Sequence, residues 1–442
     1  MVSPVATPVR ARTRWTVLVP LAGASVLGLA AGFASTSVLT AGVAAVVVLA
    51  IILKLEWAAL LVVGASVFED YLVGVDPRSV KVLGALLVVA WVVRRCSGRL
   101  HGDSRNPVLV AALAFGVVLL VATLVHNNGD TGTGVVVRYA GFLGVLLVLA
   151  DTVRGPLGPE RLARVYVGAC TVAAACGLLG YALGSDPRVG GPIEDPNDFA
   201  FFLVAAVPLA LGLRRDARRR WLLDAAAVVL VVAVIGTLSR GALLGLGAMA
   251  LVALAARMVR LRAAAGLAIG VAGALVLVVA FFPGLVEVSL DQKEHVADQN
   301  VTERLDLWSE ASRMTLQSPV VGMGPGAFSL HHDQFSTALP DDVNHPLDVA
   351  HNTWLEISSE LGALGVVAFL LLLGTAFAQA WAGWRRARDP LSAGVAVALV
   401  GTAVAATFVT EQYYLPLWLL CALAVGVTHR GRPVRLAPRE EA

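Results

Sequence analysis

His351 and Asn352 stand directly before an apolar segment, residues 353–379, that is long enough to cross a bilayer. An imidazole with an unperturbed pKa of about 6.5 can accept a proton from a hydroxyl group at neutral pH. His351 is therefore a candidate general base for a transfer reaction at a membrane surface, with a helix cap as the alternative. Asn352 either orients this ring or caps the helix, and the cap is the simpler expectation.

Three arginines, Arg188, Arg240 and Arg304, lie in connections on the side of the membrane where arginine is disfavoured. A guanidinium grips a phosphate through two parallel hydrogen bonds, so this trio suits a phosphate or diphosphate. The simpler alternatives are head-group contact for Arg240, loop stabilisation for Arg188 and a solvated helix face for Arg304. Arg313 lies nine residues beyond Arg304, about 180° round a helix, so we prefer Arg304 as the ligand contact.

Other polar residues near these positions are candidates for substrate binding. Trp308 shares a helix face with Arg304, although an interfacial anchor is its simplest role. Asn197, in the turn DPND, either caps the next helix or binds sugar hydroxyls. Glu356 and Glu360 are four residues apart, so they share a face and can pair with the arginines or line a polar crevice.

A metal centre is not favoured by the sequence. The four cysteines show no CxxC spacing, which argues against a disulfide framework or a zinc site. One group of acids and histidines offers ligand types for a divalent cation but no recognised zinc spacing: His331, His332, Asp333, Asp341, Asp342, His345 and Asp348. We therefore predict neither a metal nor a cofactor.

The elements that must position these residues are transmembrane helices. The chain is 57% hydrophobic and 15% charged, against about 25% charged in soluble proteins. The fold class we predict is all-α, a polytopic transmembrane bundle of about 12–14 spans with one large extracytoplasmic loop containing short helices. The apolar runs are near 15–34, 37–53, 57–75, 79–93, 107–125, 134–150, 163–184, 197–213, 221–238, 240–256, 262–282, 353–379, 391–409 and 413–428.

Charge predicts the orientation of these spans. Every second connection is basic, including RRDARRR at 214–220 and RRAR at 385–388, so both termini should be cytoplasmic in a plasma or inner membrane. The net charge of +3 reflects this bias, and we predict no nucleic-acid partner. The first run is followed almost at once by the second, which indicates an uncleaved helix instead of a signal peptide.

Three regions follow from this arrangement: a bundle of about eleven spans at 1–282, a large outer loop at 283–351, and C-terminal helices with a cytoplasmic tail at 352–442. Within the loop, TERLDLWSEASRMTLQS predicts a short helix that Pro319 ends. The segment GMGPGAF at 322–328 then predicts a tight bend.

Four motifs occur in order between about residues 186 and 370. They are RVGGPIEDPNDFA, Arg240-Gly-Ala-Leu-Leu244, ERLDLWSEASRMTLQSPVVGMGPGAF, and His351–Asn352 followed after nine residues by Gly362-Ala-Leu-Gly365. Together they resemble the bacterial O-antigen ligase and polysaccharide polymerase family of membrane glycosyltransferases. Each motif is weak alone, and four in order on one predicted face are specific.

The resemblance implies an enzyme that transfers an oligosaccharide from undecaprenyl diphosphate to a hydroxyl of a glycan or lipid acceptor outside the membrane. Carried over by motif, Arg240 and Arg304 would hold the diphosphate and His351 would activate the acceptor. The resemblance also implies inversion without a metal or nucleotide, with a flippase and a chain-length regulator as partners in the membrane. Ligase and polymerase share this donor chemistry, so the sequence does not choose between them.

A different class of function stays open beside the enzyme. In a transporter or channel for a small anion, the arginines would attract solute and Glu356 and Glu360 would gate it. Charged residues are scarce in the middles of the spans, which argues against a conduction path. A purely structural scaffold would leave Arg240 and His351 unexplained.

Overall fold

The structure, a computed structural model, is helical throughout its described residues apart from turns and one isolated bridge between Gly191 and Ile193. It describes residues 54–76, 79–96, 106–155, 157–184, 188–193, 195–281, 303–336 and 349–428. The apolar runs expected at 15–34 and 37–53 lie outside these residues. The predicted all-α bundle is confirmed.

The helices before the long connection are α3 (Leu55–Ala65), α4 (Glu69–Val75), α5 (Ser79–Cys96), α6 (Pro107–Val125), α7 (Gly129–Arg154), α8 (Gly158–Ala182), α9 (Pro196–Leu213), α10 (Arg220–Gly236), α11 (Arg240–Ala255) and α12 (Leu261–Phe281). Those after it are a helix at 303–317, α14 (Ala327–His331), α15 (Thr353–Ala387), α16 (Pro390–Ala405) and α17 (Leu415–Val427). Short 3₁₀ turns are η1 (Ser66–Phe68), η2 (Arg214–Asp216) and η3 (His332–Phe335).

Local sequence explains where several helices begin. Asn106, Asp195 and Asp389 each precede a proline, and each side chain accepts a hydrogen bond from a backbone N–H of the first turn. A capping oxygen satisfies a free donor, and proline at the first position needs none. These Asn/Asp-Pro pairs therefore fix the starts of α6, α9 and α16.

Six helices among the described residues are long and apolar enough to cross a membrane, and four shorter apolar helices accompany them. The run at 107–125 coincides with α6. The run predicted at 57–75 is interrupted by the 3₁₀ turn Ser66–Phe68, and the run at 391–409 ends at Ala405. The protein is a multi-pass membrane protein.

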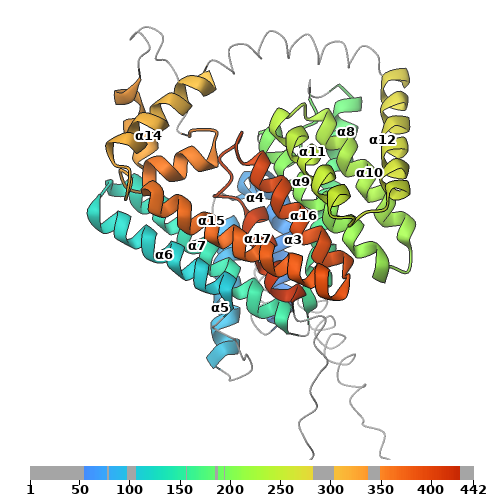
Figure 1. Ribbon diagram of the computed structural model, residues 1–442, viewed down its shortest axis with the longest axis horizontal. Coiled ribbons are helices and arrows are strands. Elements are labelled where there is room, and N and C mark those ends of the chain that lie inside the picture. Colours follow the sequence, from blue (N-terminus) through green and yellow to red (C-terminus); the bar gives the residue numbers. More distant parts are fainter. Residues whose placement is uncertain are drawn as a thin grey trace, which may run out of the picture.

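The helices alternate in direction between two ends of the bundle. One end, here called the loop end, holds the start of α7, where Asn128 donates to the carbonyls of Met323 and Pro325. The other, the basic end, holds the described arginines at or just after the C-terminal ends of α5, α7, α9, α11 and α15. There Gly212 of α9 packs against the backbone of Pro390 in α16. Figure 1 shows α15 crossing the bundle between α6 and α7 on one side and α16 and α17 on the other.

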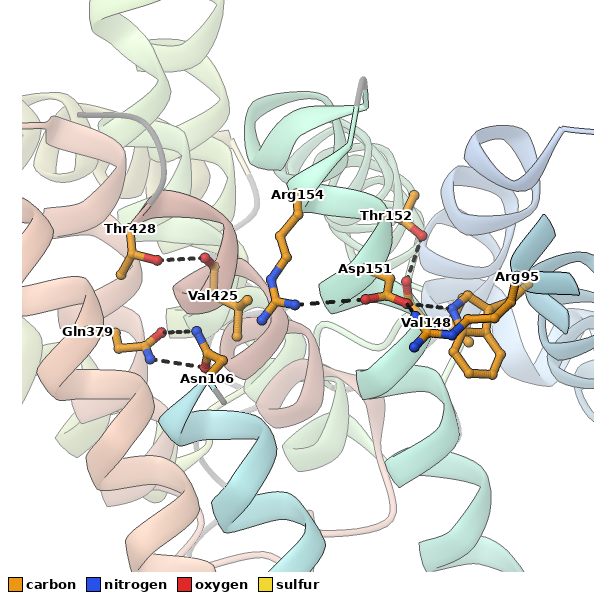
Figure 2. A network of polar contacts seen from close by, with 10 residues as sticks. Arg95, Asn106, Val148, Asp151, Thr152, Arg154, Gln379, Val425 and Thr428 are labelled. Atoms are coloured by element: carbon orange, nitrogen blue, oxygen red, sulfur yellow. Dashed lines mark hydrogen bonds and ion pairs between the residues drawn. The ribbon is translucent and has the colours of Figure 1, made fainter. Parts of the chain in front are cut away.

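Polar contacts at the basic end join helices that are distant in sequence (Figure 2). Asp151 of α7 accepts hydrogen bonds from Trp91 Nε1 at 2.8 Å and Arg95 Nη1 at 3.4 Å, and it lies 3.8 Å from Arg154 Nη1. Asn106 and Gln379 exchange amide hydrogen bonds of 3.0 and 3.4 Å between α6 and α15. These buried and half-buried groups therefore link α5, α6, α7 and α15 at the basic end.

A second, smaller core lies at the loop end. The helix at 303–317 packs through Leu307, Ala311 and Met314 against Ala327 and Phe328. Leu355 of α15 and Met323 border this cluster. The loop helices are thereby held over the start of α15, which is where His351 lies.

Candidate active site at the loop end

The connection between α16 and α17, residues 406–414, organises the start of α15. The backbone N–H of Thr353 donates to the carbonyls of Ala406 and Val409, both at 3.0 Å. Thr353 Oγ1 donates to the Val409 carbonyl at 2.9 Å and accepts from the N–H of Glu411 at 2.8 Å. Thr353 is fully buried, so these contacts fix the chain two residues after His351.

His351 itself has a left-handed backbone, with φ of 47°. Non-glycine residues in this region carry strain that persists only where the surroundings hold it, and such residues cluster at functional sites. The side chain is half-buried, and burial, with a further contribution from Arg304, lowers the pKa of its imidazole below the ordinary value. The ring is therefore neutral at pH 7, the form that accepts a proton.

Asn352 caps α15, as expected. Its Oδ1 accepts from the backbone N–H groups of Trp354 and Leu355 at 3.0 and 3.1 Å. The residue is buried, so its side chain is committed to the helix. This cap sets the direction from which His351 enters the helix.

Arg304 reaches the same connection from the loop. Its Nη1 donates to the carbonyl of Phe408 at 3.2 Å. The ring of Trp308, one turn further along the helix, lies 6.1 Å from the ring of Phe408. The Nε1–H of Trp308 is buried without an acceptor among the described residues, which leaves a donor beside Arg304. Arg313 turns away and donates to the carbonyl of Phe335.

Arg188 lies across from Arg304, on the connection before α9. Its Nε donates to the carbonyl of Thr237 at 2.7 Å, and its Nη2 donates to Asn197 Oδ1 at 3.3 Å. Asn197 Nδ2 in turn donates to Asp195 Oδ1 at 2.9 Å. The guanidinium and the amide thus form one hydrogen-bonded group above the start of α9.

Arg240 is the first residue of α11 and is exposed. Ser239 caps the helix, and Leu238 before it has a φ of 58°, which is strained for a leucine. Gly241 packs so closely against Phe408 that an added Cβ would overlap its side chain. Arg240 is consequently held beside the connection that Arg304 contacts, and among the described residues it has no hydrogen-bond or ion-pair partner.

Charge interactions tie these groups into one cluster. Arg304 interacts electrostatically with Arg188, Arg240 and His351, and Asp195 also acts on Arg304, Arg188 and His351. Burial lowers the pKa of both Arg188 and Arg304, and their mutual repulsion lowers that of Arg188 further. Three guanidiniums and an imidazole from four separate segments, together with the carboxylate of Asp195, therefore form one cluster of interacting charges.

Glu356 differs from these charged side chains because groups of the protein itself donate hydrogen bonds to its carboxylate. Its carboxylate accepts from the N–H of Ala350 at 3.0 Å, Thr410 Oγ1 at 2.9 Å and Gln412 Nε2 at 3.0 Å. Glu356 is buried, and the Ala350 contact lies one residue before His351. Its position suits it to fix the segment that carries the imidazole.

Comparison with known protein families identifies a domain that contains part of this cluster. Residues 225–370 match the family model described as O-Antigen ligase. The chain carries an O-antigen ligase family domain. No curated protein matches the chain. The matched region contains Arg240, Arg304 and His351, whereas Arg188 and Asn197 precede it. The resemblance read from the sequence motifs is confirmed at the level of the family.

The structure gives a physical reason for the GxxG element of the O-antigen ligase domain. Gly362 interrupts α15 with φ 64° and ψ −164°, a conformation open essentially to glycine alone. The break frees the N–H groups of Ala363 and Leu364 to donate to the carbonyls of Pro319 and Val320 at 2.8 and 3.2 Å. The helix break therefore anchors the loop that carries Arg304.

Two acidic residues of this site were not singled out from the sequence. Asp198, in the first turn of α9, accepts from the hydroxyl of Tyr414 at 3.1 Å and interacts electrostatically with the fully buried Glu411. Burial, with Asp198 next in effect, raises the pKa of Glu411 well above its ordinary value. Glu411 is therefore the carboxyl group of the two that tends to hold a proton. The polar run TEQYY within an apolar C-terminal region was the available signal.

Of the candidate ligands for a divalent cation, His332 makes other contacts. His332 is buried, stacks on Phe328 and lies 3.0 Å from Glu310 through Nδ1. Within the described part of the chain no group of three or more acids, histidines or cysteines could hold a metal ion. Asp341, Asp342, His345 and Asp348 lie outside the described residues.

Proposed function

We propose that the protein transfers an oligosaccharide from undecaprenyl diphosphate to a hydroxyl acceptor, as a ligase or polymerase of cell-surface polysaccharide. The family domain implies lipid-linked glycan substrates. The loop end would face the outside of the plasma or inner membrane, with the basic end in the cytoplasm. A flippase delivering the donor and a chain-length regulator are the partners this reaction calls for.

One observation carries the proposal. Arg304 interacts electrostatically with Arg188, Arg240 and His351, four residues spread over more than a third of the chain. Bringing three guanidiniums together in a partly buried region is unfavourable unless anions compensate them, and the carboxylates of Asp195 and Asp198 supply part of that compensation. A diphosphate would supply the remainder, and a neutral imidazole beside it has no role in anion binding alone.

The reaction follows from these groups. A ring nitrogen of His351 takes the proton of the acceptor hydroxyl while the acceptor oxygen forms a bond to the anomeric carbon. The bond from that carbon to the diphosphate oxygen breaks, and its electron pair leaves with the lipid diphosphate. Arg240 and Arg304 stabilise the charge that develops there. A direct displacement of this kind inverts the anomeric centre and needs no metal.

The remaining site residues would bind the substrate or position His351. Arg188 and Asn197 form one hydrogen-bonded group suited to the second phosphate or the first sugar. Trp308, half-buried beside Phe408, offers its ring to a sugar. For Glu356 we propose positioning of His351, in place of the substrate contact expected from sequence, and for Asn352 a cap that sets the direction of His351, because both side chains have hydrogen-bond partners within the protein.

The test is transfer of a lipid-linked oligosaccharide by the purified protein in liposomes. His351→Ala should lower the rate by about 10²- to 10⁴-fold through loss of the base. Arg240→Ala should lower it by about 10²- to 10³-fold through loss of charge stabilisation.

Matched controls use the same substitutions elsewhere. His331→Ala changes a half-buried histidine at the end of α14, and Arg262→Ala changes an arginine at the basic end. Both should transfer at near the normal rate. Normal transfer by His351→Ala and Arg240→Ala would overturn the proposal, and anion flux in liposomes without any lipid-linked sugar would favour the transporter instead.

A further inference from the structure

A cavity of about 470 Å³ lies between α9, α10, α11, α12 and α16. It follows the last turns of α9 and α11 and the first turns of α12 and α16, so it belongs to the basic end. Small side chains on these helices, among them Gly212, Ala250, Ala253 and Ala264, leave the space open. In Figure 1 α12 stands at the edge of the bundle beside α10. The cavity is thus bordered by a helix that itself meets lipid.

The lining of this cavity is mostly apolar and carries charge at one place. Apart from two arginines, it consists of apolar side chains, prolines and a few glycines and alanines. Arg214 is neutralised by Asp224, whose carboxylate lies 2.6 Å from its Nε. Arg260 is exposed and has no ion-pair partner among the described residues. The rim of an apolar cavity therefore carries one uncompensated positive charge.

We infer that this cavity binds an acidic phospholipid of the leaflet at the basic end, with an acyl chain in the cavity and the phosphate on Arg260. Basic pockets between transmembrane helices on the cytoplasmic side recognise such head groups. The volume lies within the roughly 300–1,000 Å³ of small-ligand sites. A zwitterionic lipid would leave Arg260 without a net counter-charge.

The proposed glycan donor is a poor occupant of this cavity. Its diphosphate would bind at Arg240, the first residue of α11, whereas the cavity rim lies beyond the last turn of α11. The helix has 16 residues, so roughly 24 Å separates the two ends. The lipid site is consequently independent of the transferase reaction, and its test does not use that reaction.

The test measures lipid binding to the delipidated full-length protein by native mass spectrometry. The probes are phosphatidylglycerol, phosphatidylcholine with the same acyl chains, and glycerol phosphate without acyl chains. The protein should retain phosphatidylglycerol in preference to phosphatidylcholine and should not retain glycerol phosphate. Equal retention of both lipids would overturn the inference, and retention of glycerol phosphate would show an anion site without an acyl-chain site.

Two variants with neighbouring controls locate the site. Arg260→Gln should weaken phosphatidylglycerol binding about fivefold, as expected for one arginine at a lipid surface. Ala264→Phe should fill the cavity and abolish retention. Arg262→Gln and Ala265→Phe alter exposed residues two and one positions away that do not line the cavity, and should bind within about twofold of normal. Equal behaviour of each variant and its control would overturn the assignment, and Arg260→Gln alone decides it if Ala264→Phe fails to fold.

Discussion

The two ends of the bundle use the same kind of side chain in opposite ways. At the basic end several arginines face carboxylates, as in Arg94 with Glu56 at 2.7 Å and Arg214 with Asp224 at 2.6 Å. At the loop end Arg304 donates to a backbone carbonyl and interacts electrostatically with Asp195 and Asp198 as well as with Arg240. The closely paired arginines hold helices together, whereas Arg240 has no ion-pair partner among the described residues and is exposed to a ligand.

The backbone shows the same difference. Arg257 and Arg388, at the basic end, have φ of 53° and 50° directly after helices, where a left-handed residue commonly ends a helix. Leu238, at the loop end, has φ of 58° and likewise follows the end of a helix, α10, whereas His351, with φ of 47°, directly precedes the cap of α15 and follows no described helix. The strain at His351 is therefore supported by tertiary contacts, as expected of a functional region.

The prediction with the largest expected effect compares one substitution at each end: the loop-end change should reduce activity, and the basic-end change should reduce stability. Arg304→Gln should lower transfer by about 10²- to 10³-fold while leaving the unfolding temperature nearly unchanged. Asp151→Asn should leave transfer nearly unchanged and lower the free energy of unfolding by about 1.5–3 kcal/mol, because the half-buried Trp91 and Arg154 lose their charged partner. Transfer assays and thermal unfolding of both variants check this, and the comparison fails if each variant damages both properties equally.

The second prediction concerns pH. Burial and Arg304 lower the pKa of His351 below its ordinary 6.5, so the transfer rate should hold at pH 6.5 and then fall about tenfold per pH unit below the lowered pKa. Because the unfolded chain binds this proton more tightly, unfolding should also become easier as pH drops below about 6.5. His351→Gln should remove the His351 contribution to that stability slope. A rate that already falls above pH 6.5 would contradict the neutral-base assignment.

The smallest effect separates the two kinds of left-handed residue. Arg257→Gly should raise the free energy of unfolding by about 1 kcal/mol, since glycine ends a helix without strain, and should leave transfer intact. His351→Gly relieves the same backbone strain but removes the imidazole, so transfer should be lost. Unfolding curves and transfer rates of both variants provide the measurement; a loss of transfer in Arg257→Gly would speak against a purely local role.

Much of the fold could be predicted because helix boundaries depend on short-range features. Hydropathy placed the run 107–125, and Asn106 with Pro107 fixed its start. The break at Gly362 could not be read in this way, because it depends on hydrogen bonds to Pro319 and Val320 more than forty residues earlier. Domain boundaries and site roles remain predictions, as does the orientation in the membrane.

By itself the sequence determined the helical class, the membrane location, the family resemblance and the candidates Arg240, Arg304 and His351, since apolar length and motif spacing are local properties of the chain. Only the tertiary structure decided that Glu356 is satisfied internally and that Asp198 meets Glu411, which lies 213 positions away. Those outcomes depend on which distant backbone and side-chain groups share a buried space, and a buried polar group takes its state from its neighbours.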